Sequence, residues 1–417
     1  MSEVPPEPSG RRVAIFSTAD WDTELPTNKH HFARLWARRN RVLFIETLGT
    51  RRPELSAARD WGRIGRRLRR GLEGAVKRAP RLWSVSPVVR PAWDTPLAVA
   101  ANRGLFAASA GRALDRFAPE ILWVYSPYAA HLIERTPRRA LVYHLVDDLA
   151  AVPGADREAI RAAEAMLFAQ ADLVFCTEPS LLDRAARSTP RAHLMLNVAD
   201  YTHFSDPSPR AGQDPAALRR LAALPRPLVL FSGQLASHKI DLRLLRDLAR
   251  LRPRWSFALV GPRWEGDPDR RALDALAALP NVALTGRIPY EHLPPALHLA
   301  DALLMPYRLT EATRAVFPLK LFEYFGTGRP VVGTAELPSL LPYSEAMRLA
   351  PNRAEDWAAA LEAAMSEPPE RGELRRELAR RNTWERRFSE MSALLAPLLG
   401  PAPAATSLRR SGGTRRG

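Results

Sequence analysis

Short apolar runs alternate with helical patterns along most of the 417-residue chain, and this alternation constrains its fold more than any other feature. The first run, 13–17, is followed by a loop, by a helix that Asn28 is suited to begin, and by a second apolar run at 42–46. Strand, helix and strand in this order form a βαβ unit, in which the two strands are parallel. The sequence therefore predicts an α/β protein whose parallel sheets are covered by helices on both faces.

The alternation continues on both sides of a segment rich in Pro, Asp, Arg and Ala. Further apolar runs lie at 82–86, 121–125, 141–145, 173–177, 192–196, 228–235, 255–262, 281–289, 302–307, 331–332 and 347–349. A chain of this length is long for one domain and sufficient for two. We predict a disordered tail at 1–11, a Rossmann-like domain at 12–205, a linker at 206–226, a second Rossmann-like domain at 227–380, a final helix at 381–400 and a disordered basic tail at 401–417.

The composition indicates the cellular location of the protein and argues against some kinds of cofactor. No apolar run approaches the roughly 20 residues that span a bilayer, and the first residues lack the plan of a signal peptide. The one cysteine, Cys176, lies in an apolar run, so we expect a buried structural thiol in a reducing, cytoplasmic location rather than a nucleophile. The glycine fingerprint of dinucleotide enzymes is absent, and no ligand cluster calls for a metal. We therefore expect no covalently bound cofactor.

A net charge of +16 raises the question of an anionic partner. The densest basic segment, 59–81, carries apolar residues at helical spacing, which predicts a basic amphipathic helix. Such a helix can lie on an anionic membrane surface, here the inner face of the plasma membrane, and the alternative is a solvated arginine-rich helix. No nucleic-acid-binding motif accompanies the charge, so we expect no specific nucleic-acid partner.

Residues 317–332 have the most specific pattern. Pro318 suits the first turn of a helix, which Gly326 and Gly328 end before a new strand begins. Free N–H groups at the start of a helix bind anions, and Lys320 adds a positive charge beside them. Glu323, one turn later, is an acceptor for sugar hydroxyls. Hydrogen-bond donors for a phosphate and an acceptor for sugar hydroxyls at this spacing suit a nucleotide-sugar. The alternative is a structural junction in another α/β protein.

The pattern Pro-x-Lys-x-x-Glu-Tyr-x-x-x-Gly-x-Pro-Val-Val in this stretch resembles that of bacterial teichuronic-acid-type glycosyltransferases. The resemblance implies the GT-B architecture, in which two Rossmann-like domains face a cleft and a final helix crosses back to the N-terminal domain. It also implies transfer of a sugar from a nucleotide-diphosphate sugar, the co-substrate, to a glycan or lipid-linked acceptor. The larger retaining families carry an additional glutamate where this chain has Ala315, so the stereochemical outcome stays open.

The resemblance also assigns the other donor-binding positions. A turn from Gly233 to Lys239 is similar to the phosphate-binding turn Gly-Arg-Leu-x-x-x-Lys, with Gln234 in place of its first basic residue. Arg287 and Ile288 fall where the backbone meets the nucleotide base. Within residues 317–332, the implied donor-binding residues are Pro318, Leu319, Lys320 and Glu323.

In the first domain, the resemblance places Trp21, Lys29 and His31 in a loop and helix start that meet the donor phosphate or the acceptor. The alternative is that these residues only cap or solvate the helix start.

Asp147 and Asp148 follow the apolar run 141–145, at the strand end where open α/β sheets bind their ligands. A carboxylate there can remove the proton from an attacking hydroxyl, and we expect Asp147 before Asp148 in this role. His144 occupies the first acidic position of the similar family run and is the third candidate. The alternative for the two aspartates is helix capping.

Two other functions remain open. One is a nucleotide-sugar epimerase on the same fold, which needs no acceptor. The other is a basic, non-catalytic scaffold that has kept the fold.

Overall fold

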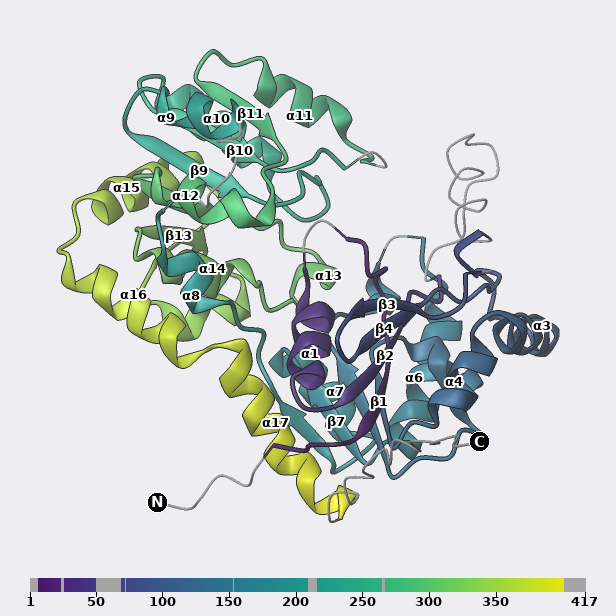
Figure 1. Cartoon of the computed structure of the whole chain (residues 1–417). Coiled ribbons are helices and arrows are strands. Elements are labelled where there is room, and N and C mark those ends of the chain that lie inside the picture. The colour runs from purple at the N-terminus through teal and green to yellow at the C-terminus, as the bar shows by residue number, and fades with distance from the viewer. Residues whose placement is uncertain are drawn as a thin grey trace, which may run out of the picture.

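The computed structural model describes residues 7–23, 26–49, 69–71, 73–152, 154–208, 216–264, 267–314 and 316–400. Two bodies, each a sheet flanked by helices, are joined by chain segments that cross between them (Figure 1). Among the described residues, the first sheet has eight strands in the order β3-β4-β2-β1-β5-β6-β7-β8, and the second has six in the order β11-β10-β9-β12-β13-β14. The two predicted parallel sheets are therefore confirmed.

The elements of the first body, in chain order, are β1 (Arg12–Phe16), α1 (Asn28–Ala37), β2 (Arg41–Ile45), β3 (Val76–Ala79), β4 (Leu82–Val85), α3 (Pro96–Phe106), α4 (Arg112–Phe117), β5 (Ile121–Val124), α5 (Ala130–Ile133), β6 (Ala140–Leu145), α6 (Arg157–Gln170), β7 (Leu173–Cys176), α7 (Pro179–Ala186) and β8 (Ala192–Leu194). A π-helical turn, Ala107–Gly111, joins α3 to α4, so the two helices are continuous but locally widened between them.

Two short helices, α8 (Tyr201–Ser205) and α9 (Ala216–Ala222), come between the sheets. The second body contains β9 (Leu228–Ser232), α10 (Leu242–Leu251), β10 (Ser256–Val260), α11 (Arg270–Ala277), β11 (Val282–Gly286), α12 (Leu293–His298), β12 (Ala302–Met305), α13 (Glu311–Arg314), α14 (Lys320–Thr327), β13 (Val331–Thr334), β14 (Arg348–Ala350), α15 (Ala354–Met365) and α16 (Glu370–Arg381). The last helix is α17 (Trp384–Leu399).

Each sheet separates two cores because successive side chains of a strand point to opposite faces. Ala14 and Phe16 of β1 belong to one buried cluster, whereas Val13 and Ile15 belong to the cluster on the other face. The strands of the second sheet divide their side chains in the same way. Burial on both faces explains why the strands read as continuous apolar runs in the sequence.

The basic segment agrees with its prediction at residues 69–71, which are helical, and differs from it at 76–79. Val76–Ala79 is strand β3, antiparallel to β4, and not the end of an amphipathic helix. Arg78 reaches Asp22 with its Nη1 atom at 3.0 Å and donates from Nε to Ser84 at 2.8 Å. A hairpin with its own ion pairs therefore replaces the predicted helix here. Residues 59–68, including Arg66 and Arg67, lie outside the described residues.

The chain crosses between the two bodies at two adjacent places. Ala199 and Thr383 form an isolated parallel bridge, so the outgoing and returning segments lie side by side. After the first crossing, Phe204 of α8 is buried in the core of the second body, although 12–205 was predicted as the first domain. After the second crossing, α17 packs on the first body (Figure 1). There the Phe388 ring meets the Trp36 ring edge-on, with 4.9 Å between the ring centres.

The strand order also determines where ligands bind. In the second sheet, β9 is flanked by β10 on one side and by β12 on the other, which is the 3-2-1-4-5-6 order of dinucleotide-binding folds. In the first sheet, β1 lies between β2 and β5 in the same manner. Ligands of open α/β sheets bind at the carboxyl ends of the strands, where the order reverses. The positions to examine are therefore the ends of β1 and β5 and the ends of β9 and β12.

Those two edges face each other. Arg157, which begins the helix after β6, pairs with Glu311, which follows β12, at 3.1 Å between Nη2 and Oε2. Asn28 Nδ2 donates to Asn197 Oδ1 at 3.2 Å, and Asn197 Nδ2 donates to the carbonyl of Phe317 at 3.1 Å. The Arg157–Glu311 pair and the Asn197–Phe317 hydrogen bond join segments that follow strands of one sheet to segments that follow a strand of the other.

Candidate functional site

Lys320 lies directly over Gly233, at the carboxyl end of β9. A Cβ atom on Gly233 would come within 2.5 Å of Lys320 Cε and 2.7 Å of its Nζ. Gly233 also has φ +142°, a conformation that side chains rarely adopt. The Lys320 Nζ atom lies 5.6 Å from the centre of the Phe231 ring. The structure therefore brings together two predicted donor-binding residues that are far apart in the sequence.

A tyrosine holds α14 in this position. The Ser232 N–H donates to the Tyr324 hydroxyl at 2.9 Å, and the Tyr324 side chain is fully buried. α14 begins at Lys320, after Pro318 rather than at it, and continues through Gly326 to Thr327. A Cβ atom on Gly326 would lie 3.0 Å from Phe204 Cβ, so this glycine permits close packing on α8 and does not end the helix. Gly328, with φ +72°, ends it as predicted.

The charges at the start of α14 are half-buried. Burial lowers the pKa of Lys320, as does the nearby Lys239, whereas Glu323 opposes the shift. Burial raises the pKa of Glu323, and Lys320 opposes that shift. No hydrogen bond or ion pair joins either side chain to another residue that the structure describes. A half-buried ammonium group without a bonded counterion is suited to bind a phosphate oxygen.

The turn after β9 carries Lys239, whose side chain is exposed. Ser237 fixes the turn by donating its N–H to Asp267 Oδ2 at 2.7 Å. Arg308, which follows β12, donates its backbone N–H to the carbonyl of Lys239 at 2.9 Å and its Nη1 to the carbonyl of Ser237 at 3.3 Å. Arg308 thus stands beside Lys239. It adds a basic residue to the turn in which Gln234 replaces the first basic residue of the similar family pattern. Sequence reasoning missed it, although a basic residue directly after the strand at the switch point was the available signal.

Four other predicted donor-binding residues contribute differently. The Ile288 side chain is buried in the core of the second body, so only its backbone can meet a nucleotide, while Arg287 is exposed. Leu319 packs against a core cluster of the first body and so bridges the two bodies. Pro318 is buried, and its carbonyl accepts the N–H of Leu321 at 3.1 Å. These side chains shape the site rather than line it.

In the first body, Lys29 and Asp147 line one small cavity at the ends of β1, β5 and β6, together with Thr18, Tyr125, Val146 and Leu149. The cavity has room for about one water molecule. Lys29 is buried, with its Nζ atom 5.6 Å from the centre of the Tyr125 ring. Burial lowers the pKa of Lys29, and the negative charge of Asp147 opposes that shift. The two predicted residues therefore form one electrostatic unit.

The other two catalytic candidates lie elsewhere. Asp148 pairs with Arg161 at 2.7 Å and with Arg184 at 3.9 Å, so it belongs to an ion-pair network on α6 and α7. His144 points into the aromatic core between β6 and α1, where Trp123 Nε1 donates to its Nδ1 at 3.3 Å. Burial, Lys29 and Arg387 lower the pKa of His144 to about 3. Neither position favours a base that must contact a substrate, so Asp147 is the stronger candidate of the three.

Trp21 and His31 also point away from that cavity. The Trp21 ring packs edge-on against Phe44 at 5.1 Å and against His30 at 5.5 Å. His31 stacks on Trp384 at 4.7 Å, at the junction with α17, and burial lowers its pKa to about 3. The Trp21–His31 segment therefore supplies one residue, Lys29, to the cavity at the strand ends, and its aromatic residues support the domain junction.

Among the described residues, no group of three or more His, Cys, Asp and Glu side chains could hold a metal ion. Within the same residues, no helix is long and apolar enough to cross a membrane. Cys176 is fully buried, and burial raises its pKa to about 12, which agrees with a structural thiol.

Known proteins share this architecture. The sequence model of the family described as glycosyl transferases group 1 matches residues 226–367. A protein of Bacillus subtilis (strain 168), named as the teichuronic acid biosynthesis glycosyltransferase TuaH, is 28% identical over 249 residues. That match covers 56% of this chain and 59% of the relative, so the chain spans less than two thirds of the relative's length.

Two solved structures illustrate the similarity of the fold. Sucrose-phosphate synthase from Thermosynechococcus elongatus superposes with a TM-score of 0.68 at 16% identity, over 93% of this chain and 98% of that one. Anabaena HepE, solved in complex with UDP-glucose, superposes with a TM-score of 0.63 at 13% identity, over 93% of this chain and all of the other. The chain therefore has the GT-B fold, and its residues 226–367 form a glycosyl transferases group 1 domain.

Proposed function

We propose that this protein transfers a sugar from a nucleotide-diphosphate sugar to an acceptor hydroxyl. One observation carries the proposal: Lys320 lies unpaired over Gly233, at the switch point of a sheet with dinucleotide-binding strand order. Because Gly233 has no side chain, a diphosphate can approach its backbone closely, and Lys320 supplies a positive charge for that diphosphate. The group 1 domain and the resemblance to glycosyltransferases support the same assignment.

The second body binds the donor. Lys320, Lys239 and Arg308 surround the diphosphate, and Glu323 accepts hydrogen bonds from the sugar hydroxyls. The backbone near Arg287 and Ile288 meets the base. HepE was solved with UDP-glucose, so UDP-hexoses are the first donors to test. Arg308, whose backbone N–H donates to the carbonyl of Lys239, supplies the one basic group that the phosphate turn lacks because of Gln234.

The first body activates the acceptor. Asp147 removes the proton from the acceptor hydroxyl while that oxygen forms a bond to the anomeric carbon of the donor sugar. The bond from that carbon to the diphosphate oxygen breaks, and the nucleoside diphosphate leaves with the bonding electrons. Lys320 and its neighbours stabilise the charge that develops on the leaving oxygen. Lys29 lines the same cavity as Asp147, and the negative charge of Asp147 opposes the lowering of the Lys29 pKa by burial.

We further propose that the acceptor is a lipid-linked or cell-surface polysaccharide precursor reached from an anionic membrane surface. This rests on the basic segment 59–81, of which residues 59–68 and 72 lie outside the described residues. Replacing Arg66, Arg67, Arg69 and Arg70 by Gln should release the protein from vesicles that contain anionic lipid. Unchanged vesicle binding would end this part of the proposal.

Calorimetric titration with UDP, GDP and UDP-glucose tests the donor site. We expect one nucleotide to bind and its sugar conjugate to lose at least about tenfold in affinity in Glu323→Ala, since a hydrogen bond to a charged group contributes about 1.5–3 kcal/mol. Glu370→Ala removes an exposed glutamate at the opposite end of the second body and should change nothing. If no nucleotide binds, the scaffold becomes the better interpretation.

Product analysis distinguishes the proposed transferase from the remaining alternative, an epimerase. A transferase releases nucleoside diphosphate in proportion to acceptor glycosylated. An epimerase would change the sugar of the donor with no acceptor and no stoichiometric release of nucleotide. Donor turnover without an acceptor, with the nucleotide still attached to the sugar, would contradict the proposed transfer.

A further inference from the structure

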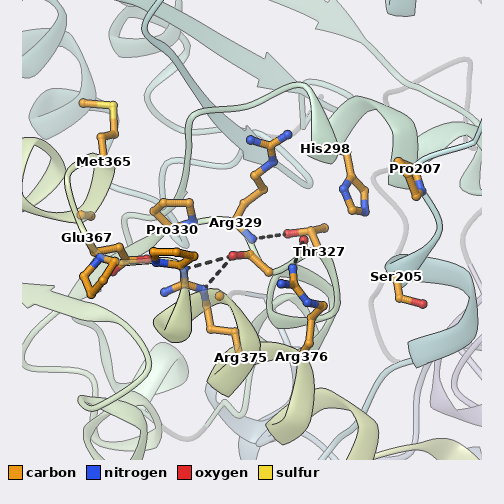
Figure 2. Close-up of a pocket in the computed structure, with 15 residues that line it drawn as sticks. Ser205, Pro207, His298, Thr327, Arg329, Pro330, Met365, Glu367, Arg375 and Arg376 are labelled. Carbon is orange, nitrogen blue, oxygen red and sulfur yellow. Dashed lines mark hydrogen bonds and ion pairs between the residues drawn. The ribbon is translucent and has the colours of Figure 1, made fainter.

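A second cavity lies at the other edge of the second sheet. Its volume is about 560 Å³, within the range of small-molecule sites. Residues Gly328–Pro330, just before β13, form one wall, so the cavity is at the amino ends of the strands and away from Lys320. Segments distant in sequence complete it (Figure 2): the end of α12, the residues that end and follow α8, and the connection from α15 to α16.

Two arginines of this cavity are already engaged. Arg375 donates to the carbonyls of Gly328 and Ala346 and pairs with Glu367, and its side chain is almost fully buried. Arg376 donates to the carbonyl of Thr327 at 3.4 Å and pairs with Glu373. Together they satisfy carbonyls at the end of α14, so the partial negative charge of that helix end is offset.

Arg329 is different. Its backbone N–H donates to Thr327 Oγ1 at 3.0 Å, but its guanidinium group has no hydrogen bond or ion pair with any residue the structure describes. Figure 2 shows this side chain extending away from Arg375 and Arg376, on the side of the cavity where His298 lies. The nearby Asp301 already pairs with Arg226 at 3.0 Å. Arg329 is thus a half-buried cation whose acidic neighbour is engaged.

The electrostatics agree with this geometry. Burial lowers the pKa of Arg329, Arg226 and Arg376 lower it further, and Asp301 opposes them. Keeping the guanidinium charged in these surroundings costs free energy that a bound anion would offset. A planar guanidinium binds phosphate or carboxylate groups through two parallel hydrogen bonds, which gives the anion a defined orientation.

The remaining walls suit an organic body rather than a bare ion. Their apolar part comes from Pro207, Pro330, Met365, Pro368 and Pro369, and their polar part comes from Ser205, His298, Thr327 and Glu367. The Ser205 hydroxyl at the end of α8 adds a polar group on the side opposite Met365 (Figure 2).

We propose that this cavity binds a small organic anion, through a phosphate or carboxylate group held by Arg329, at a site separate from that of the sugar donor. The occupant contacts both the end of α8 and the turn between α14 and β13. Because α8 directly follows the crossing between the two bodies, binding there stiffens their connection.

Calorimetric titration with glycerol 3-phosphate, citrate and inorganic phosphate, with glycerol as the neutral control, tests the site. We expect at least one of the two organic anions to bind and glycerol not to bind. Affinity should fall at least about tenfold in Arg329→Gln, as expected when a charge-assisted hydrogen bond is lost. Arg250→Gln, which removes an exposed arginine of α10, should bind like the wild type. Binding only of inorganic phosphate, or of no anion, would overturn the proposal.

Two further variants keep the test decisive if Arg329→Gln is poorly folded. Ser205→Asp places a carboxylate inside the cavity, where it should neutralise Arg329 and abolish anion binding without lowering the melting temperature. Lys320→Gln should leave anion binding unchanged. If saturating UDP displaces the anion, or if Lys320→Gln abolishes its binding, the anion occupies the donor site and the proposed second site does not exist.

Discussion

The two bodies each place a lysine at the switch point of a parallel sheet, yet the surroundings of the two lysines differ. Lys29 of the first body is buried on the Tyr125 ring and shares a cavity of about one water molecule with Asp147. Lys320 of the second body is half-buried over a bare glycine backbone, and Glu323 on the same helix moderates its charge. Burial lowers the pKa of both lysines.

From this difference we expect the two lysines to have different roles. In the first body the carboxylate and the lysine come from separate elements and line one small cavity, which has no space for a large ligand. In the second body the backbone opposite the lysine is open, which suits the binding of a large anionic group. Four experiments test this contrast.

The largest effect is expected at Asp147. Replacing it by Asn removes the proposed base, so turnover should fall by about 10²–10⁴-fold, while the affinity for the nucleotide stays unchanged. Steady-state kinetics and calorimetry measure the two quantities. Asp148→Asn is the matched control: it breaks the ion pairs with Arg161 and Arg184, so it should lower stability but keep turnover per folded molecule. Equal losses of turnover in the two variants would contradict the assignment of the base.

Lys320→Met should weaken nucleotide binding by about 10–100-fold and at the same time stabilise the fold at neutral pH. Because burial lowers the pKa of Lys320, the unfolded chain binds more protons than the folded chain between that lowered pKa and the ordinary value of 10.5. The stability of the wild type therefore rises with pH in that interval, and the advantage of the Met variant shrinks. Chemical denaturation at several pH values measures the difference in stability between the wild type and the Met variant. A difference that widens as the pH rises would refute the claim that burial lowers the pKa of Lys320.

Gly233→Ala should lower nucleotide affinity by about tenfold and reduce stability. The new methyl group meets Lys320 and strains a backbone at φ +142°, and such strain costs about 1–3 kcal/mol. Gly154→Ala is the control, since it has φ +79° and no atom within 4 Å of the added Cβ. If both variants lose stability and only Gly233→Ala loses affinity, the close approach of Lys320 to Gly233 matters for binding.

The smallest effect is expected for Asn197→Ala, which removes the hydrogen bonds that join Asn28 to Phe317 between the two bodies. We expect a loss of about 1–3 kcal/mol in the free energy of unfolding, because buried partners are left unsatisfied. Thermal or denaturant unfolding measures it. Nucleotide affinity should barely change, since the donor groups all lie in the second body; a large loss of affinity would mean that the first body also binds the donor.

Much of the architecture could be predicted from the sequence. Short apolar runs separated by helices identified the parallel strands, and the pattern at 317–332 identified Lys320 and Glu323 as neighbours on one helix. The prediction was wrong for β3, because a basic strand at a sheet edge has no apolar run and was read as helix. It also misjudged Gly326, whose role depends on Phe204, a residue more than a hundred positions earlier.

The sequence by itself determined the α/β class, the order of strands and helices, and the local chemistry at the start of α14, because these depend on the periodicity and capping of neighbouring residues. The tertiary structure decided which charges meet. It placed Lys29 and Asp147 on one cavity and Arg308 beside Lys239. It diverted Asp148 and His144 to other partners, and it left Arg329 without one among the described residues. These contacts depend on how two sheets and their crossing segments pack, which no local pattern in the chain encodes.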